Sequence, residues 1–152
     1  MTLVGPEAVK IVWRLYDNPR AAAQARRLVR DVLRTLPLPD AVVDDAVLMV
    51  SELVGNAVLH GSPPFELDLR VGDGELHAEV LDAGSGGPRP RDAGSEAEHG
   101  RGLGIVAQLS GGRYGCRPAA YATERDRYGK AVWCAMRIES FSTADPSPAV
   151  SR

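Results

Sequence analysis

The chain of 152 residues is long enough for one domain with a buried core and has no room for two. Its residues are 44% hydrophobic and 25% charged, and the formal net charge of −2 gives no general attraction to nucleic acid or anionic membranes. No stretch approaches the roughly 18 consecutive apolar residues of a membrane-spanning helix, and the N-terminal segment lacks the pattern of a secretory leader. We therefore expect a cytoplasmic protein with one domain over residues 1–141 and a disordered, Pro-containing tail over residues 142–152.

The first elements predicted are a strand and a helix. Partial alternation of apolar residues favours a strand over Val9–Leu15. Asp17-Asn18-Pro19 is a helix-start pattern, and the following helix should run to about Leu36, ahead of Pro37. Its apolar stripe is Ala22, Ala25, Val29, Val32 and Leu36, while Arg20, Arg27, Arg30 and Arg34 lie on the other side with Arg26 at the border.

A second helix is predicted from an Asp40 N-cap to His60, and Gly61 should end it in the left-handed conformation. His60 is interpreted as a structural residue that stabilises the end of this helix. The apolar residues that keep helical spacing and should face the core are Val43, Val47, Val50, Val54 and Ala57.

The rest of the chain is predicted to be mainly strands. Two strands, Phe65–Val71 and Glu75–Leu81, should be joined by a turn at Gly72-Asp73-Gly74. After a Gly-rich loop and a short helix that ends before Gly111, two more strands are expected at Gly112–Arg117 and Ala131–Ile138. Strands and helices that mix without strict βαβ alternation indicate the α+β class, with a mixed, mostly antiparallel sheet in a two-layer α/β sandwich.

Cys116 and Cys134 are far apart in sequence and form no Cys-x-x-Cys or Cys/His cluster. In a chain without a secretory leader, two such cysteines are typical of buried thiols.

One candidate site lies on the second predicted helix. Glu52, Asn56 and His60 are four residues apart, so they project from one side of the helix, away from its apolar stripe. A carboxylate and a carboxamide one turn apart offer oxygen ligands to a hard cation, and the carboxylate can also accept a proton from an attacking hydroxyl. The same pattern also fits a plain solvated helix face.

Two glycine-containing segments are further candidates. Asp82, Gly84 and Gly86 follow an apolar strand, where the backbone can approach a planar ligand and the carboxylate can accept a hydrogen bond from an exocyclic amine. An ordinary Asp-Gly turn is the alternative. The stretch Gly100-Arg101-Gly102-Leu103-Gly104 should open a helix, where backbone N–H groups and the Arg101 charge can bind phosphate. Glycines at a helix entry can equally be present for steric reasons. Neither the Rossmann nor the P-loop pattern is present.

The order of these three segments resembles the N, G1 and G2 boxes of the GHKL (Bergerat-fold) ATPase and kinase superfamily. Within it, the chain is similar to the anti-sigma-factor serine kinases of the SpoIIAB/RsbW type, with a short loop between the two glycine segments and a final strand that contains Gly129-Lys130-Ala131-Val132-Trp133. The resemblance covers about Val9 to Ile138 and implies the Bergerat ATP-binding fold.

The resemblance also implies roles for individual residues. Asp82 would accept the adenine amine of ATP, with Gly84 and Gly86 beside the ring, and Asn56 would coordinate Mg²⁺. The triphosphate would be bound by Arg101 and the amides around Gly102, Leu103 and Gly104. Glu52 would orient or deprotonate the serine hydroxyl of a partner protein, and the segment Gly87–His99 would be a lid over the nucleotide.

The implied partners are a sigma factor, which the protein sequesters, and an anti-anti-sigma protein of the STAS type, whose serine it phosphorylates. Arg26 is the best match to the partner-contacting arginine of the resembling kinases, and Arg30 lies one turn further along. Relatives commonly form homodimers. A protein-binding module that uses ATP without phosphoryl transfer remains an alternative function. A detached histidine-kinase catalytic domain is disfavoured, because the sequence has no upstream pair of phosphoacceptor helices.

Two features depart from the resembling kinases. Ala131 stands where many relatives have Thr, whose hydroxyl would help to hold the adenine end. The connection Pro118–Tyr128 is longer than expected and is interpreted as a solvated hairpin tip.

Overall fold

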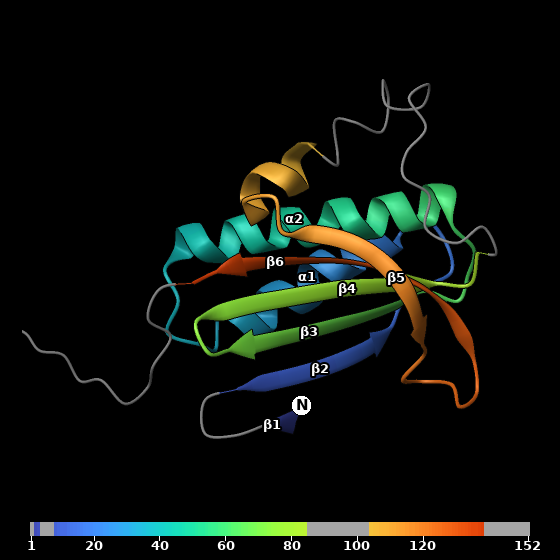
Figure 1. The fold of residues 1–152 in the computed structure, drawn as a ribbon. Helices are drawn as coiled ribbons and strands as arrows, with labels where there is room; N and C mark the ends of the chain where they lie inside the picture. Colours follow the sequence, from blue (N-terminus) through green and yellow to red (C-terminus); the bar gives the residue numbers. More distant parts are fainter. Residues whose placement is uncertain (1, 4–7, 85–103, 139–152) are drawn as a thin grey trace, which may run out of the picture.

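A computed structural model describes residues 2–3, 8–84 and 104–138, and all structural statements below concern these residues. They form two layers, an antiparallel sheet and a pair of helices that cover one of its faces (Figure 1). The predicted α+β two-layer class is therefore confirmed. The sheet is not mixed, however, because every strand pair in the described part is antiparallel.

The sheet has six strands in the order β1-β2-β3-β4-β6-β5. Sequence patterns predicted all of them except the two-residue β1, which is too short to carry any periodicity. The bounds are β1 Thr2–Leu3, β2 Val9–Arg14, β3 Glu66–Gly72, β4 Glu75–Asp82, β5 Tyr114–Ala120 and β6 Tyr128–Arg137.

The two helices are α1 (Ala21–Leu33) and α2 (Asp40–His60), and α2 has the predicted bounds. Both bury their apolar faces against strands β3, β4 and β6 in one hydrophobic core. On α1 the buried residues are Ala21, Ala25, Val29 and Leu33, so its stripe lies slightly to one side of the predicted one. The five core residues predicted on α2 are all buried.

The helix starts differ from the predicted caps. The Asn18 side chain accepts a hydrogen bond from the Arg20 amide in a turn that precedes α1, so the helix begins at Ala21 rather than at Pro19. Asp40 is the first residue of α2 instead of its N-cap, which is the extended Pro39. Pro39 offers no side-chain acceptor, but the Asp40 carboxylate still lies in the first turn, where the helix dipole favours negative charge.

The hairpin between β3 and β4 turns as predicted. Asp73 and Gly74 both have positive φ angles, of 54° and 73°, which is the pattern of a type I′ turn. The strands on either side pair from Gly72–Glu75 to Glu66–Leu81, and this register places alternate β4 side chains against the helices or on the open face of the sheet.

The chain from residue 104 onward contains a short helix over residues 104–110 and then the β5–β6 hairpin. Val106 of the short helix is fully buried in the main core, and Leu109 packs against that core. The loop between β5 and β6 covers residues 121–127 and is shorter than the predicted connection Pro118–Tyr128, because the ends of that segment belong to the two strands.

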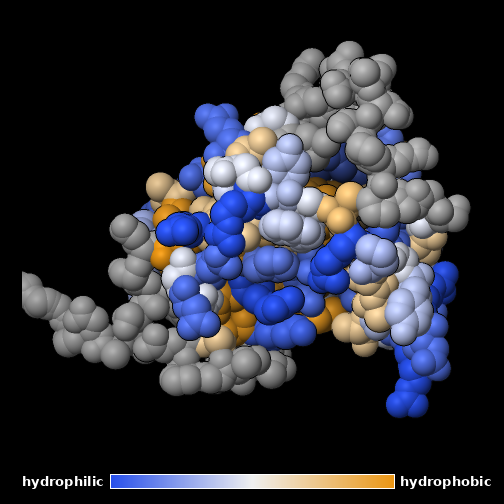
Figure 2. Space-filling view, in the orientation of Figure 1, coloured by the Kyte–Doolittle hydropathy of each residue, from blue (hydrophilic) through white to orange (hydrophobic). Residues whose placement is uncertain are grey.

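The open face of the sheet is largely hydrophilic in its centre (Figure 2). Within the described residues, no helix is long and apolar enough to cross a membrane. Cys134 is a buried free thiol as predicted, but Cys116 is exposed, since it lies on the outermost strand β5. The predicted tail over residues 142–152 lies outside the described part of the chain.

Candidate functional site

Asp82 is a buried carboxylate at the end of β4, with only 1% of the residue exposed. It shares the helix-facing side of β4 with Ala78 and Val80, so its side chain points toward the end of α2. Its Oδ1 accepts hydrogen bonds from the Gly84 amide at 2.7 Å and the Ser62 amide at 3.3 Å. Among the described residues no hydrogen bond engages Oδ2, so this oxygen can accept one from a ligand.

Glycines from three separate segments surround Asp82. A Cβ atom on Gly61 would lie 2.5 Å from the Asp82 Cγ atom, and one on Gly84 would lie 2.8 Å from Oδ1. A Cβ atom on Gly129 of β6 would overlap the Asp82 carbonyl oxygen. Any larger residue at these positions would displace the carboxylate or its backbone.

The prediction that Gly61 adopts the left-handed conformation is wrong. Gly61 is extended, with φ −104° and ψ −163°, and its amide donates to the Ala57 carbonyl to close the last turn of α2. Glycine is needed there because the Asp82 carboxylate packs directly against its Cα atom. The sequence pattern of a helix stop was correct, but its physical reason is a tertiary contact.

Glu52 and Asn56 lie on α2, upstream of Gly61, and both are partly exposed. With a rise of about 1.5 Å per residue, Asn56 lies about 7–8 Å and Glu52 about 13–14 Å along the helix axis from Gly61. Asp82, Asn56 and Glu52 therefore follow one another along α2, with Asp82 at its C-terminal end. His60, at the same end, is exposed.

Sequence reasoning missed Lys130. Its position on β6 pairs with Asp82, and its Cε and Nζ atoms lie 3.8 Å from the place a Cβ on Gly84 would occupy. Lys130 thus lies on the same side of the sheet as Asp82, next to Gly84. Ala131, which was assigned to the adenine end, instead packs with Leu81 and Tyr121 on the open face of the sheet. A Thr hydroxyl at position 131 would not face Asp82, and Lys130 is the β6 residue on that side.

The predicted phosphate-binding segment is only partly described. Gly104 is the first residue of the helix over residues 104–110 and is exposed, and a Cβ atom added to it would meet open space within the described part of the chain. Gly86, Gly100, Arg101, Gly102 and Leu103 lie outside the described residues, as does the predicted lid Gly87–His99.

The two predicted partner-binding arginines lie on α1. Arg26 is exposed, and its Nη1 atom donates a hydrogen bond of 2.8 Å to Oγ of Ser51, the residue before Glu52. Arg30 is partly exposed in the last turn of the helix. The structure therefore connects Arg26, but not Arg30, directly to the helix that carries Glu52.

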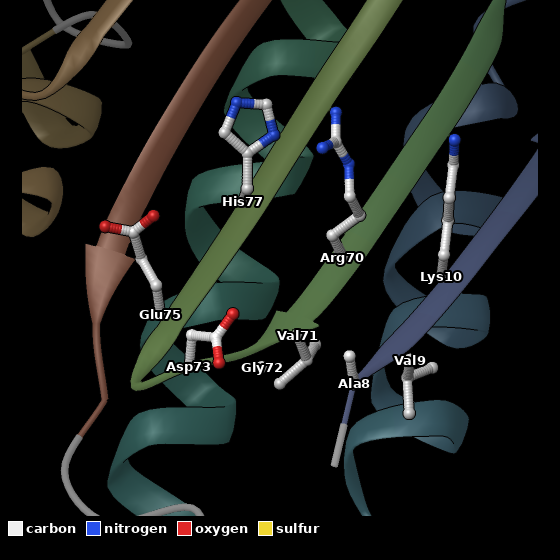
Figure 3. A pocket seen from close by; sticks show the side chains of 9 residues that line it. All are labelled: Ala8, Val9, Lys10, Arg70, Val71, Gly72, Asp73, Glu75 and His77. Carbon is white, nitrogen blue, oxygen red and sulfur yellow. The ribbon is translucent and has the colours of Figure 1, made fainter. Parts of the chain in front are cut away.

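A separate hollow of about 400 Å³ lies at the other end of β4 (Figure 3). Lys10, Arg70 and His77 project into it from three adjacent strands, and the acidic Asp73 and Glu75 lie at its other side. His77 is on the open sheet face, opposite to the side on which Asp82 points. The hollow is thus distinct from the candidate site around Asp82.

The donor and acceptor set around Asp82 fits an adenine nucleotide. A buried carboxylate oxygen can accept the exocyclic amine, and neighbours without side chains leave the backbone open to a planar ring. No three His, Cys, Asp or Glu side chains gather as a metal site in the described part of the chain. A magnesium ion bound with the nucleotide would be held by the Asn56 oxygen together with phosphate oxygens, as is usual for this ion.

Comparison with known protein families adds an independent finding. The family profile described as "Histidine kinase-like ATPase domain" matches residues 15–111, which include α1, α2, β3, β4 and Gly104. Among curated proteins, no match to the chain was found.

Proposed function

The chain belongs to the histidine kinase-like ATPase domain family, and on that basis we propose that it is an ATP-dependent anti-sigma factor with serine kinase activity. In this proposal the protein binds ATP and Mg²⁺, phosphorylates a serine of a STAS-type antagonist, and sequesters a sigma factor when it is not bound to that antagonist. Because sigma factors act in the cytoplasm, the proposed function requires a cytoplasmic location.

The observation that supports the proposal is the linear order of Asp82, Asn56 and Glu52 along α2. The buried Asp82 carboxylate with its glycine surroundings would bind the purine. Asn56, at about 7–8 Å along the helix axis, suits a metal-bound phosphate, and Glu52 lies at about 13–14 Å, beyond the phosphates. A group that acts on an incoming hydroxyl is needed at that far end, because phosphoryl transfer requires the attacking and leaving oxygens to be roughly in line.

Each residue contributes binding, orientation or proton transfer. Asp82 would accept a hydrogen bond from the adenine amine, with Lys130 on the same side of the sheet. The Asn56 oxygen would hold the magnesium ion, whose charge would offset that of the phosphates. As the partner's serine oxygen formed its bond to the terminal phosphorus of ATP, the bond from that phosphorus to the bridging oxygen would break and ADP would leave. Glu52 would accept a hydrogen bond from this serine hydroxyl and take up its proton at a carboxylate oxygen. Gly104, with the predicted residues before it, offers backbone amides for the phosphates.

The proposed partner surface is the arginine-bearing face of α1. Arg26 and Arg30 would contact acidic side chains of the sigma factor and of the STAS protein. Arg26 is the stronger candidate, because its contact with Ser51 holds it beside Glu52, where the serine must arrive.

The test combines transfer with binding. The protein is incubated with γ-labelled ATP, Mg²⁺ and recombinant STAS proteins of the same organism, and we expect label on a serine of one of them. Calorimetry should also give an ATP affinity that Asp82→Asn lowers at least tenfold. The Asn oxygen can still accept from the Gly84 and Ser62 amides, so the fold should persist. Tight ATP binding without transfer to any STAS protein would favour the non-catalytic binding module, and unchanged affinity in Asp82→Asn would refute the adenine assignment.

A further inference from the structure

The loop that joins β5 to β6, residues 121–127, folds back onto the open face of the sheet. Tyr121 is only 5% exposed and packs with Leu81 of β4 and Ala131 of β6 in a small apolar cluster, separate from the main core. The interpretation of this segment as a solvated hairpin tip is therefore wrong for Tyr121, although the next two residues are exposed.

Two polar anchors hold this loop to the start of β3. The Glu66 carboxylate accepts three hydrogen bonds, from the Ala122 amide at 2.9 Å, the Thr123 amide at 2.7 Å and the Thr123 hydroxyl at 2.6 Å. The Tyr121 hydroxyl donates to the Pro64 carbonyl at 2.7 Å. We call these contacts the Glu66–Tyr121 latch.

The hydrogen bonds of the latch are not needed to close the turn between β5 and β6. Glu66 is 1% exposed, and burying a carboxylate costs free energy unless several donors compensate it. The donors come from residues 56 and 57 positions away in sequence, so the contact fixes the loop against β3 rather than closing the loop itself. Fully satisfied buried polar networks of this kind favour one conformation over its neighbours.

The latch lies directly behind Asp82. Leu81, which Tyr121 covers, precedes Asp82, so the two side chains leave the same backbone segment on opposite faces of the sheet. A Cβ on Gly129 of β6 would overlap the Asp82 carbonyl and would lie 3.1 Å from the Tyr121 ring. Burial and then the negative charge of Asp82 raise the pKa of Tyr121 to about 12, which agrees with this proximity.

We propose that Tyr121 and Glu66 are positioning residues that fix the Asp82 carboxylate from the opposite face of the sheet, and that they thereby set the selectivity for adenine over a 6-oxo purine. The inference rests on the proposed nucleotide site. Asp82 can favour binding of a purine with a 6-amino group only if its carboxylate is held in place, because a hydrogen bond weakens steeply with misalignment. In the proposed site the phosphates lie beyond Asn56, away from the latch, so we expect their contribution to affinity to be unchanged.

The test measures the affinities of the full chain for ATP and for inosine triphosphate, which carries oxygen where ATP carries the amine. Tyr121→Phe removes only the hydroxyl, and Glu66→Gln replaces a pure acceptor by a group that also donates. In both variants we expect ATP to bind about 3- to 30-fold more weakly while inosine triphosphate binding is unchanged, so that the selectivity ratio falls. Tyr128→Phe is the matched control, since Tyr128 is 73% exposed and outside the latch, and it should keep the wild-type ratio.

The ratio separates positioning from general destabilisation, because a smaller folded fraction weakens both nucleotides equally. If both latch variants keep the wild-type ratio, or lose both affinities in parallel, the inference is overturned. Should Glu66→Gln fail to fold, Tyr121→Phe decides alone. Asp82→Asn separates the latch role from the nucleotide site. If Asp82→Asn lowers the selectivity ratio and the latch variants do not, only the latch role fails. A wild-type ratio in Asp82→Asn refutes the nucleotide assignment itself.

Discussion

Arg26 and Ser51 join the two helices, through a hydrogen bond of 2.8 Å from the guanidinium Nη1 atom to the serine Oγ atom. Ser51 directly precedes Glu52, so the bond holds an α1 arginine next to the proposed catalytic carboxylate. An exposed contact of this type contributes little to stability, typically less than about 1 kcal/mol. The bond instead orients Arg26 toward α2, which would place the proposed partner surface beside the proposed phosphoryl-transfer site.

Removing Arg26 should therefore weaken partner binding without changing the nucleotide site. We expect Arg26→Ala to lower the affinity for the proposed STAS partner at least tenfold. Ser51→Ala keeps the Arg26 charge but removes its hydrogen-bond acceptor, and it should lower this affinity by about two- to fivefold. ATP affinity should stay at the wild-type value in both. Arg137→Ala is the control, because Arg137 is exposed on the open face of the sheet, away from α1. Biolayer interferometry and calorimetry give the two affinities, and equal losses in Arg26→Ala and Arg137→Ala would contradict a special role for Arg26.

Replacing Glu52 should separate binding from transfer. Glu52→Gln preserves the size of the side chain but can no longer take up a proton, so we expect phosphoryl transfer to fall at least about 100-fold. ATP affinity should change by no more than about twofold, since Glu52 lies far from Asp82 along α2. Asp45→Asn, about two turns earlier and exposed on the same side of the helix, is the matched control and should leave transfer unchanged. Single-turnover kinetics with labelled ATP measures the effect, and full activity in Glu52→Gln would remove it from the mechanism.

The sequence was most informative where one element carries its own pattern. The helical spacing of Val43, Val47, Val50 and Val54 predicted the buried face of α2, because helix period and core burial act on the same residues. The Asp73-Gly74 turn was equally local, since positive φ angles favour these residue types. The three boxes predicted Asp82 and Asn56 as site residues from motifs that each lie within one segment, and their roles stay predictions.

Contacts between distant segments could not be predicted from any local pattern. Glu66 lies in an alternating strand, where a solvated carboxylate is the ordinary expectation, and its donors follow more than fifty residues later. Gly61 was recognised as a helix end, but its contact with Asp82 depends on how β4 packs against α2. Lys130 was missed because only the β4–β6 register brings it to Asp82.

Alanine should be harmful at Gly61, which follows α2, and stabilising at Gly55 within α2. At Gly61 the new Cβ would lie 2.5 Å from the Asp82 Cγ atom, so Gly61→Ala should displace the carboxylate and lower ATP affinity at least tenfold. The extended backbone of Gly61 tolerates alanine, so strain is not the cause. Within the described part of the chain, a Cβ on Gly55 would meet nothing within 4 Å beyond the neighbouring residues and backbone of its own helix, and Gly55→Ala should raise the free energy of unfolding by about 0.5–1 kcal/mol through helix propensity. Urea unfolding and calorimetry measure both, and a stabilising Gly61→Ala would contradict the close approach.

The open face of the sheet carries a histidine whose titration opposes folding at mildly acidic pH. His77 stacks on Trp133 with ring centroids 5.8 Å apart, and its Nδ1 atom is buried without a hydrogen-bond partner among the described residues. Burial, more than any neighbouring charge, lowers the pKa of His77 below its ordinary value of 6.5, although the carboxylate of Glu79 opposes that shift.

The free energy of unfolding should therefore fall as the pH drops below about 6.5. In that range the unfolded chain, with the ordinary pKa, already binds a proton that the folded His77 does not yet accept, so acid favours unfolding. The slope from this one group is at most about 1.4 kcal/mol per pH unit, and it vanishes well above pH 6.5, where His77 is neutral in both states. His77→Gln removes the titration, so urea unfolding at about pH 7.5 and pH 5.5 should show a smaller loss of stability in the variant than in the wild type. An equal loss of stability in both proteins would mean that His77 binds a proton as easily in the folded chain as in water. The lowered pKa of His77 would then be contradicted.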